Sequence, residues 1–194
     1  MRRLILLLAV LAMVTPVLAA PRVVASIMPI HSIVSAVMGN LGRPELLFSG
    51  KLSEHTASLT PRQIEALSHA DIVFMVGHAL EFKLGEIDGS EAVNGKIFVQ
   101  LDKSPGVKVL PVRTGGTWEA DTDEPQAPAA ASDNGIVLSF DPHIWLDPEN
   151  AKAMVNAVAA ELSRADPANA AAYAANATDY NAFQIGRASC RERV

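Results

Sequence analysis

The segment LTPRQIEALSHADIVFMVGHALE, residues 59–81, decides the class of fold. Residues 60–63 place a threonine before a proline and a glutamine three positions after that threonine, which is the pattern of a capped helix start. This start predicts a helix that ends near His69. The run 71–76 is apolar, too short for another helix, and closed by Gly77, which indicates a buried strand. A helix that leads directly into a buried strand is typical of an α/β domain.

The same alternation continues on both sides of this segment. We expect further strands at 23–27, 45–48, 96–100 and, more weakly, 107–110, and further helices at 30–38, 79–84, 148–165 and from 167 onward. Two Asp-Pro steps, 147–148 and 166–167, supply an aspartate cap and a proline in the first turn for the last two helices. The sequence therefore predicts an α/β lobe with a mostly parallel sheet flanked by helices. Ligands of such sheets bind beyond the carboxyl ends of the strands.

The first residues are typical of an export signal. Residues 1–19 combine two arginines, an apolar run and small residues before the expected cleavage after Ala19. The alternative is a membrane anchor, but the run Leu4–Val14 is shorter than the roughly 20 residues that a span needs. The whole chain of 194 residues carries a net charge of −5. This acidity argues against nucleic acid as a partner and suits an exported protein that meets cations.

The chain beyond the signal divides into three parts. We expect an N-terminal lobe at 20–165, containing a flexible acidic loop at 113–135, and the start of another long helix at 166–183. Residues 184–194 hold the only cysteine, Cys190, and resemble a translated sequencing adaptor, so we interpret them as an artefact. A genuine basic tail is the alternative.

Two of the five histidines have surroundings that favour a metal site. His55 follows Glu54 in a polar loop behind a strand, where it is either a cation ligand or a solvated surface residue. His143 lies in SFDPHIWLDPEN, residues 139–150, between two Asp-Pro steps. We expect the apolar residues 144–146 to anchor it, and Asp141 or a backbone carbonyl to orient its ring. On its own, this setting fits a metal ligand and a structural hydrogen-bonding residue equally.

The other histidines give weaker signals. His31 lies just beyond the first strand, on the side where ligands bind, although a polar residue in the first helical turn is the simpler interpretation. His69 ends a helix, where a cation suits the helix dipole. His78 follows a strand, and we expect a structural role for it. The sequence contains no HxxxH, HExxH, CxxC or GxSxG pattern.

Taken in order, three segments resemble one known family. VVASIMPIHSIVSAVMG begins at Val23, SEHTASLTPRQIEALSHADIVFMVGHALE begins at Ser53, and the DPHIWLDPEN segment continues to Phe183. Together they resemble the metal-binding solute-binding proteins of zinc and manganese ABC transporters. The resemblance implies two α/β lobes joined by a long helix, with the metal between them. It further implies that this chain contains the N-terminal lobe and lacks the C-terminal one.

The same resemblance implies a function and a site. His55 and His143 would be metal ligands, with Glu54 and His31 as weaker candidates, and the remaining ligands would come from the absent lobe. The protein would be a periplasmic monomer without catalytic activity that captures Zn²⁺, or alternatively Mn²⁺, and delivers it to the membrane permease of an ABC transporter. Because neutral imidazole binds the metal, affinity should fall below about pH 6.5. An exported metallohydrolase and a metal-binding adhesin remain alternatives.

Overall fold

The computed structural model describes residues 20–49, 58–112 and 140–191, with side chains as far as Phe183. The predicted signal peptide, the acidic loop 113–135 and the pair Glu54 and His55 lie outside the described residues. What the structure describes is the lobe that the sequence predicted.

Four parallel strands form the centre of the lobe. They are β1 (Val23–Ala25), β2 (Glu45–Leu46), β3 (Ile72–Met75) and β4 (Ile97–Gln100), in the spatial order β2-β1-β3-β4. The predicted parallel sheet is confirmed, although all four strands are shorter than the ranges predicted from the sequence. Every residue of β1 and β3 is buried, because helices cover both faces of this part of the sheet.

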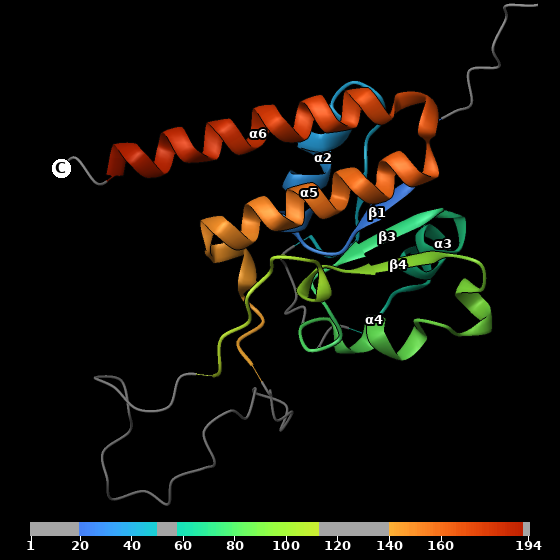
Figure 1. The fold of residues 1–194 in the computed structure, drawn as a ribbon. Coiled ribbons are helices and arrows are strands. Elements are labelled where there is room, and N and C mark those ends of the chain that lie inside the picture. The colour runs from blue at the N-terminus through green and yellow to red at the C-terminus, as the bar shows by residue number, and fades with distance from the viewer. Residues whose placement is uncertain (1–19, 50–57, 113–139, 192–194) are drawn as a thin grey trace, which may run out of the picture.

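The helices form a layer on each side of the sheet (Figure 1). Figure 1 shows α2 (Met28–Met38), α5 (Pro148–Ala165) and α6 (Ala170–Arg191) on one side, and α3 (Pro61–His69) and α4 (Phe82–Ile87) on the other. Short 3-10 helices connect them at Glu91–Val93 (η1), Leu101–Lys103 (η2), Ile144–Leu146 (η3) and Pro167–Asn169 (η4). Within the described ranges, no helix is both long enough and apolar enough to cross a membrane.

Local caps set the helix starts that the sequence predicted. Thr60 accepts a hydrogen bond from the backbone of Gln63, and the Gln63 side chain accepts one from the Thr60 backbone at 2.8 Å, which completes a capping box. Asp147 accepts from the Glu149 backbone N–H at 2.8 Å at the start of α5. Gly39 ends α2 with φ of 54°, a conformation that favours glycine.

The strand expected at 107–110 does not form. This segment makes one antiparallel bridge, between Leu110 and Asp141. Its Lys108 backbone instead binds the side chain of Asn150: the N–H donates to Oδ1 at 2.7 Å, and the carbonyl accepts from Nδ2 at 2.8 Å. Because a side chain already satisfies these two backbone groups, Lys108 has none left for a neighbouring strand.

Two helix starts also differ from the prediction. Residues 78–80 form a turn, so α4 begins at Phe82 rather than near residue 79. After Asp166, the 3-10 turn η4 intervenes and α6 begins at Ala170. The Asp166 carboxylate does not cap the backbone there; it accepts from Asn169 Nδ2 at 2.8 Å and from the Tyr173 hydroxyl at 2.9 Å.

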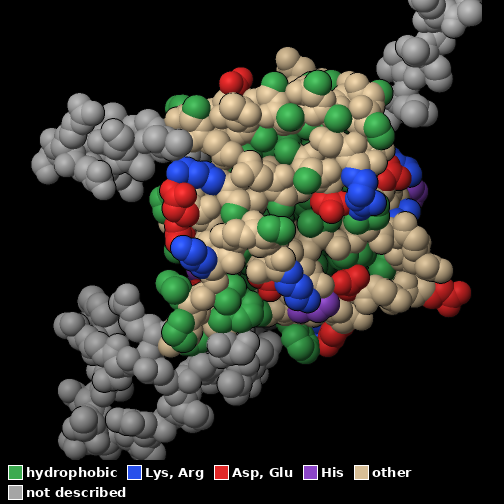
Figure 2. Space-filling model, viewed as in Figure 1, with side chains coloured by type: hydrophobic (Ala, Val, Ile, Leu, Met, Phe, Trp, Pro, Cys, Tyr) green, Lys and Arg blue, Asp and Glu red, His purple; other side chains and the backbone are tan. Residues whose placement is uncertain are grey.

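Charges of both signs alternate on the surface shown in Figure 2, where blue and red side chains lie next to each other. Three ion pairs at helical i, i+3 spacing join charges of opposite sign on the described surface: Lys83–Glu86, Lys152–Glu149 and Arg164–Glu161. A nucleic-acid interface requires a basic patch, and this face has none among the described residues.

The Asn150 amide is the first feature that we propose to test. Asn150→Ala should lower the free energy of unfolding by about 2–3 kcal/mol, because it removes the side-chain partner of three backbone groups, two part-buried ones at Lys108 and a buried carbonyl at Ile144. Urea denaturation of both proteins measures this difference. Asn156→Ala, an exposed asparagine on the same helix, is the matched control and should cost under about 1 kcal/mol. Equal losses in the two variants would contradict the role of Asn150.

Candidate metal centre

His143 lies at the edge of the lobe to which the carboxyl ends of the strands point. It immediately precedes η3, which leads into α5. In Figure 1 the arrowheads of β3 and β4 point toward the same end of the molecule as the start of α5. The structure therefore places His143 at the edge where the strands end, which is where ligands of parallel sheets commonly bind.

The ring of His143 is oriented by a neighbouring carboxylate. Nδ1 donates to Asp141 Oδ1 at 2.7 Å, and the same oxygen accepts from the His143 backbone N–H at 3.0 Å. With the proton on Nδ1, a neutral imidazole carries its lone pair on Nε2, which is the arrangement of most metal-binding histidines. Both side chains are about half exposed, at 43% for His143 and 51% for Asp141.

The anchors of this segment differ from those expected. Pro142 and Ile144 are buried, and the ring of Trp145 is half-buried and meets the His143 ring edge-on at 5.3 Å between centroids. Leu146, expected to anchor the segment, is 73% exposed. In η3 only Ile144 turns fully into the core, since a tight 3-10 turn directs successive side chains to different sides. The Asn150 amide adds a third anchor by donating to the Ile144 carbonyl at 3.2 Å.

The residues directly after β2 precede His55 in the sequence and continue the pairing with β1. Past the end of β2, Leu47 donates its N–H to the Ala25 carbonyl at 2.9 Å and Phe48 donates to the Ser26 carbonyl at 2.8 Å. Both side chains are buried. The backbone is thus held in register with β1 as far as Phe48, seven positions before His55 in the sequence.

His31 has partners of its own. Its Nε2 donates to the Pro44 carbonyl at 3.1 Å, and its Nδ1 lies 3.5 Å from the Ser35 hydroxyl. A metal ion bound here would have to displace one of these contacts. The predicted role of His31 as a ligand therefore stays a prediction without support from the geometry.

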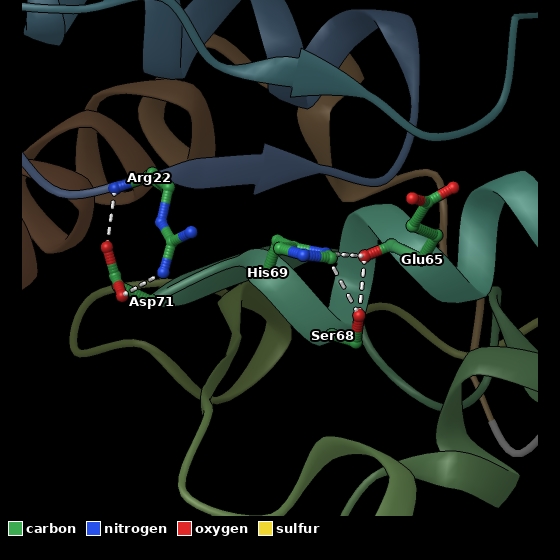
Figure 3. Close-up of polar contacts among 5 residues, drawn as sticks. All are labelled: Arg22, Glu65, Ser68, His69 and Asp71. Carbon is green, nitrogen blue, oxygen red and sulfur yellow. Dashed lines mark hydrogen bonds and ion pairs between the residues drawn. The ribbon is translucent and has the colours of Figure 1, made fainter.

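His69 lies at the amino-terminal side of the sheet. Figure 3 shows its ring beside Glu65 and Ser68, with Nδ1 donating to the Glu65 carbonyl at 2.8 Å. On the same side, the Arg22 backbone N–H donates to Asp71 at 2.8 Å, and this contact, with the guanidinium, holds the pKa of Asp71 below its usual range. His78 lies elsewhere, with Nε2 2.9 Å from Asp88 Oδ2.

The described part of the chain does not complete a metal site. No three histidine, cysteine, aspartate or glutamate side chains gather there in a way that could hold an ion. His143 is therefore the one proposed principal ligand with known geometry, since Glu54 and His55 lie outside the described residues.

Sequence reasoning missed a buried carboxylate at this edge of the sheet. Glu81 is fully buried and accepts three hydrogen bonds: from Ser26 Oγ at 2.5 Å, from the Val76 N–H at 3.0 Å and from the Gly77 N–H at 3.0 Å. Burial raises the pKa of Glu81 to about 7, while these hydrogen bonds oppose the rise. A single acid between Leu80 and Phe82, just after a buried strand, was the available signal.

Comparison with solved structures shows which known fold the lobe shares. The solute-binding protein FpvC from Pseudomonas aeruginosa, solved with Mn²⁺, matches with a TM-score of 0.71 at 22% identity, over 90% of this chain and 57% of that chain. At this level of identity the match concerns the fold. The described lobe therefore shares its fold with part of that protein.

Sequence comparison then defines the family. The family model of ZnuA, zinc-uptake complex component A, periplasmic, matches residues 23–183. The high-affinity zinc uptake system protein ZnuA of Brucella abortus (strain 2308) is 35% identical over 178 residues, which cover 81% of this chain and 53% of the relative. The corresponding protein of Paracoccus denitrificans (strain Pd 1222) is 32% identical over 175 residues, covering 81% and 52%. The chain belongs to the ZnuA family and spans about half the length of these relatives.

The contact between Asp141 and His143 predicts one tautomer. At pH 8 the wild-type ring should carry its proton on Nδ1, and Asp141→Ala should shift the population toward the Nε2–H form because the acceptor is lost. Long-range ¹H–¹⁵N correlation spectra distinguish the two forms. His69, whose Nδ1 donates to a backbone carbonyl, is the internal control and should not change. A wild-type ring that already carries the proton on Nε2 would refute the assignment.

The buried Glu81 carboxyl predicts a pH dependence of stability. The folded chain holds this proton up to about pH 7, whereas the unfolded chain releases it near 4.5. The folded state therefore binds more protons between these values, and the contribution of Glu81 to the free energy of unfolding falls as pH rises through them, by about 3 kcal/mol in total. In Glu81→Gln this dependence should be missing. Urea denaturation from pH 5 to pH 8 measures it, and parallel curves for the two proteins would contradict the prediction.

Proposed function

We propose that the protein is an extracytoplasmic solute-binding protein that captures a divalent metal ion and delivers it to the permease of an ABC transporter. The observation that supports this most directly is His143, held by Asp141 with its proton on Nδ1 at the ligand-binding edge of the sheet. Membership of the ZnuA family supports the same function. No bond of the cargo is broken, so the activity is binding and release, without catalysis.

The proposed ligands are His143 and His55. In the sequence, His55 follows β2 and His143 follows the bridge between Leu110 and Asp141. We infer that the two imidazoles meet at one ion beyond the carboxyl ends of the strands. Glu54 and His31 are further candidates, and the contacts of His31 with Pro44 and Ser35 weigh against it. Two histidines are too few for tight binding of zinc, which takes four ligands in most proteins. The remaining ligands would come from residues that this chain does not contain.

Zinc is the favoured cargo. Imidazole suits zinc, whereas a manganese site would take more carboxylate oxygens. The relatives above 30% identity are named for zinc uptake. Mn²⁺ is the alternative. Ligands from a second lobe would decide between the two metals, because additional carboxylates would favour manganese.

The remaining parts of the chain complete this proposal. Residues 1–19 would direct export to the periplasm, where the protein acts as a monomer. The helix α6 would begin the connection to a second lobe, and residues 184–194 would not belong to the natural protein. In the structure α6 packs along α5 and α2 on the outer face of the lobe.

The ligands can be tested on the full chain as the native gene encodes it. His143→Ala and His55→Ala should each weaken zinc binding at least about 100-fold, because each removes one of few ligands. Competition with a chromophoric chelator at pH 7.5 measures the affinity. His69→Ala is the matched control, since His69 lies on the opposite side of the sheet, and should bind zinc as the wild type does.

The outcomes separate the proposed function from its alternatives. Unchanged affinity in both His143→Ala and His55→Ala would overturn the ligand assignment. Hydrolysis of a peptide or ester that stops in His143→Ala would instead support the metallohydrolase. Binding of a host protein that persists in the presence of a chelator would favour the adhesin.

A further inference from the structure

The buried amide of Asn150 connects the turn that carries His143 to the end of the sheet. Its Nδ2 donates at 3.2 Å to the carbonyl of Ile144, the residue directly after His143. The same amide forms two hydrogen bonds with the Lys108 backbone, at 2.7 Å and 2.8 Å. Lys108 follows β4 and η2, and its neighbour Val107 packs against the core. The amide therefore fastens the turn to a segment that the core already holds.

The segment after β4 also supports the other side of His143. Leu110, two positions after Lys108, accepts a hydrogen bond from the Asp141 N–H at 2.8 Å. The Asp141 carboxylate in turn accepts from the His143 ring at 2.7 Å. The ring thus has two supports, the Asp141 carboxylate on one side and the turn at Ile144 on the other. Both supports lead back to the same segment, and Asn150 is the side chain that joins them.

The hydrogen-bonding groups of an amide match this place. Asn150 accepts from the Lys108 N–H and donates to the carbonyls of Lys108 and Ile144, which uses its acceptor oxygen and its NH₂ group together. The residue is only 3% exposed, so water cannot replace these contacts unless the fold changes locally. An aspartate of the same shape would instead direct an oxygen at two carbonyl oxygens.

We propose that Asn150 is a positioning residue for the metal site, which acts through the turn at Ile144 on the imidazole of His143. This inference rests on the proposed function, in which His143 binds the metal. Asn150 itself does not touch the ion. It fixes the backbone that carries the ligand, and its loss lowers affinity because a metal site tolerates little error in ligand position.

Zinc competition at pH 8, on the full chain as the native gene encodes it, tests this role. Asn150→Ala should weaken zinc binding about tenfold or more, as the loss of an outer support of a metal ligand commonly does. Asn150→Asp keeps the volume of the side chain and the acceptor for the Lys108 N–H. It loses at least one donor in either charge state, so it should weaken binding as well.

Two variants of the same helix are the controls. Leu162→Ala removes a fully buried side chain from the last turn of α5, roughly 18 Å along the helix from Asn150. It should lower the stability of the lobe, because it leaves a cavity, without changing zinc affinity. Asn156→Ala removes an exposed amide and should leave zinc affinity unchanged as well.

A double-mutant cycle shows whether Asn150 acts through His143. In the His143→Ala background, Asn150→Ala should cause little further loss of zinc affinity, because the ligand that it positions is already gone. The long-range ¹H–¹⁵N signals of the His143 ring give a second readout on the metal-free protein. They should shift in Asn150→Ala and stay unchanged in Leu162→Ala.

The outcomes separate this role from general destabilisation. Wild-type affinity in Asn150→Ala, an equal loss in Leu162→Ala, or fully additive losses in the double mutant would each overturn the positioning role. Wild-type affinity in His143→Ala would instead refute the ligand assignment on which the role rests. Should Asn150→Ala fail to fold, Asn150→Asp gives the same comparison.

Discussion

The hydrogen bond between Ser26 and Glu81 addresses the main difficulty of a small parallel sheet. Strands of two to four residues end inside the protein, where the backbone N–H groups that follow them are shielded from water. Each such group costs free energy if it has no partner. A buried carboxylate at the edge supplies several acceptors at once, and it does so at the cost of desolvating a charge, which is why the pKa of Glu81 rises to about 7.

Asn150 likewise supplies side-chain partners to backbone groups that no neighbouring strand satisfies, here at Lys108 and Ile144. Its amide connects Lys108, after β4, with Ile144, before α5. It therefore ties the segment that carries His143 to a part of the chain 42 positions earlier in the sequence. An amide suits this place because it must both accept and donate, whereas Glu81 only accepts.

The features that the sequence predicted correctly are those that nearby residues determine. The cap at Thr60 and the helix start at Asp147 depend on partners two or three positions away, and the buried strand at Ile72–Met75 follows from a short apolar run. The strand expected at 107–110 was wrong because a distant asparagine takes its backbone groups. Glu81 was missed for a related reason: its role depends on Ser26, which is 55 positions away. The contact between His143 and Asp141 was predictable because the two residues are close in sequence, whereas the role of His143 as a ligand stays a prediction. Leu146 was wrongly assigned to the core because apolarity alone does not show which side of a 3-10 turn faces outward.

Burial distinguishes Glu81 and Asn150, which maintain the fold, from His143 and Asp141, which we propose serve the metal site. Glu81 and Asn150 are buried, so their hydrogen bonds contribute to stability and their loss would affect the whole lobe. Asp141 and His143 are about half exposed, and an exposed ion pair or hydrogen bond of this kind contributes at most about 1 kcal/mol to folding. Stability alone therefore gives little reason to orient this imidazole so closely. Its orientation has a clear physical reason if Nε2 must present a lone pair to an ion arriving at the edge of the sheet, since a ring fixed before binding loses less entropy when the metal binds.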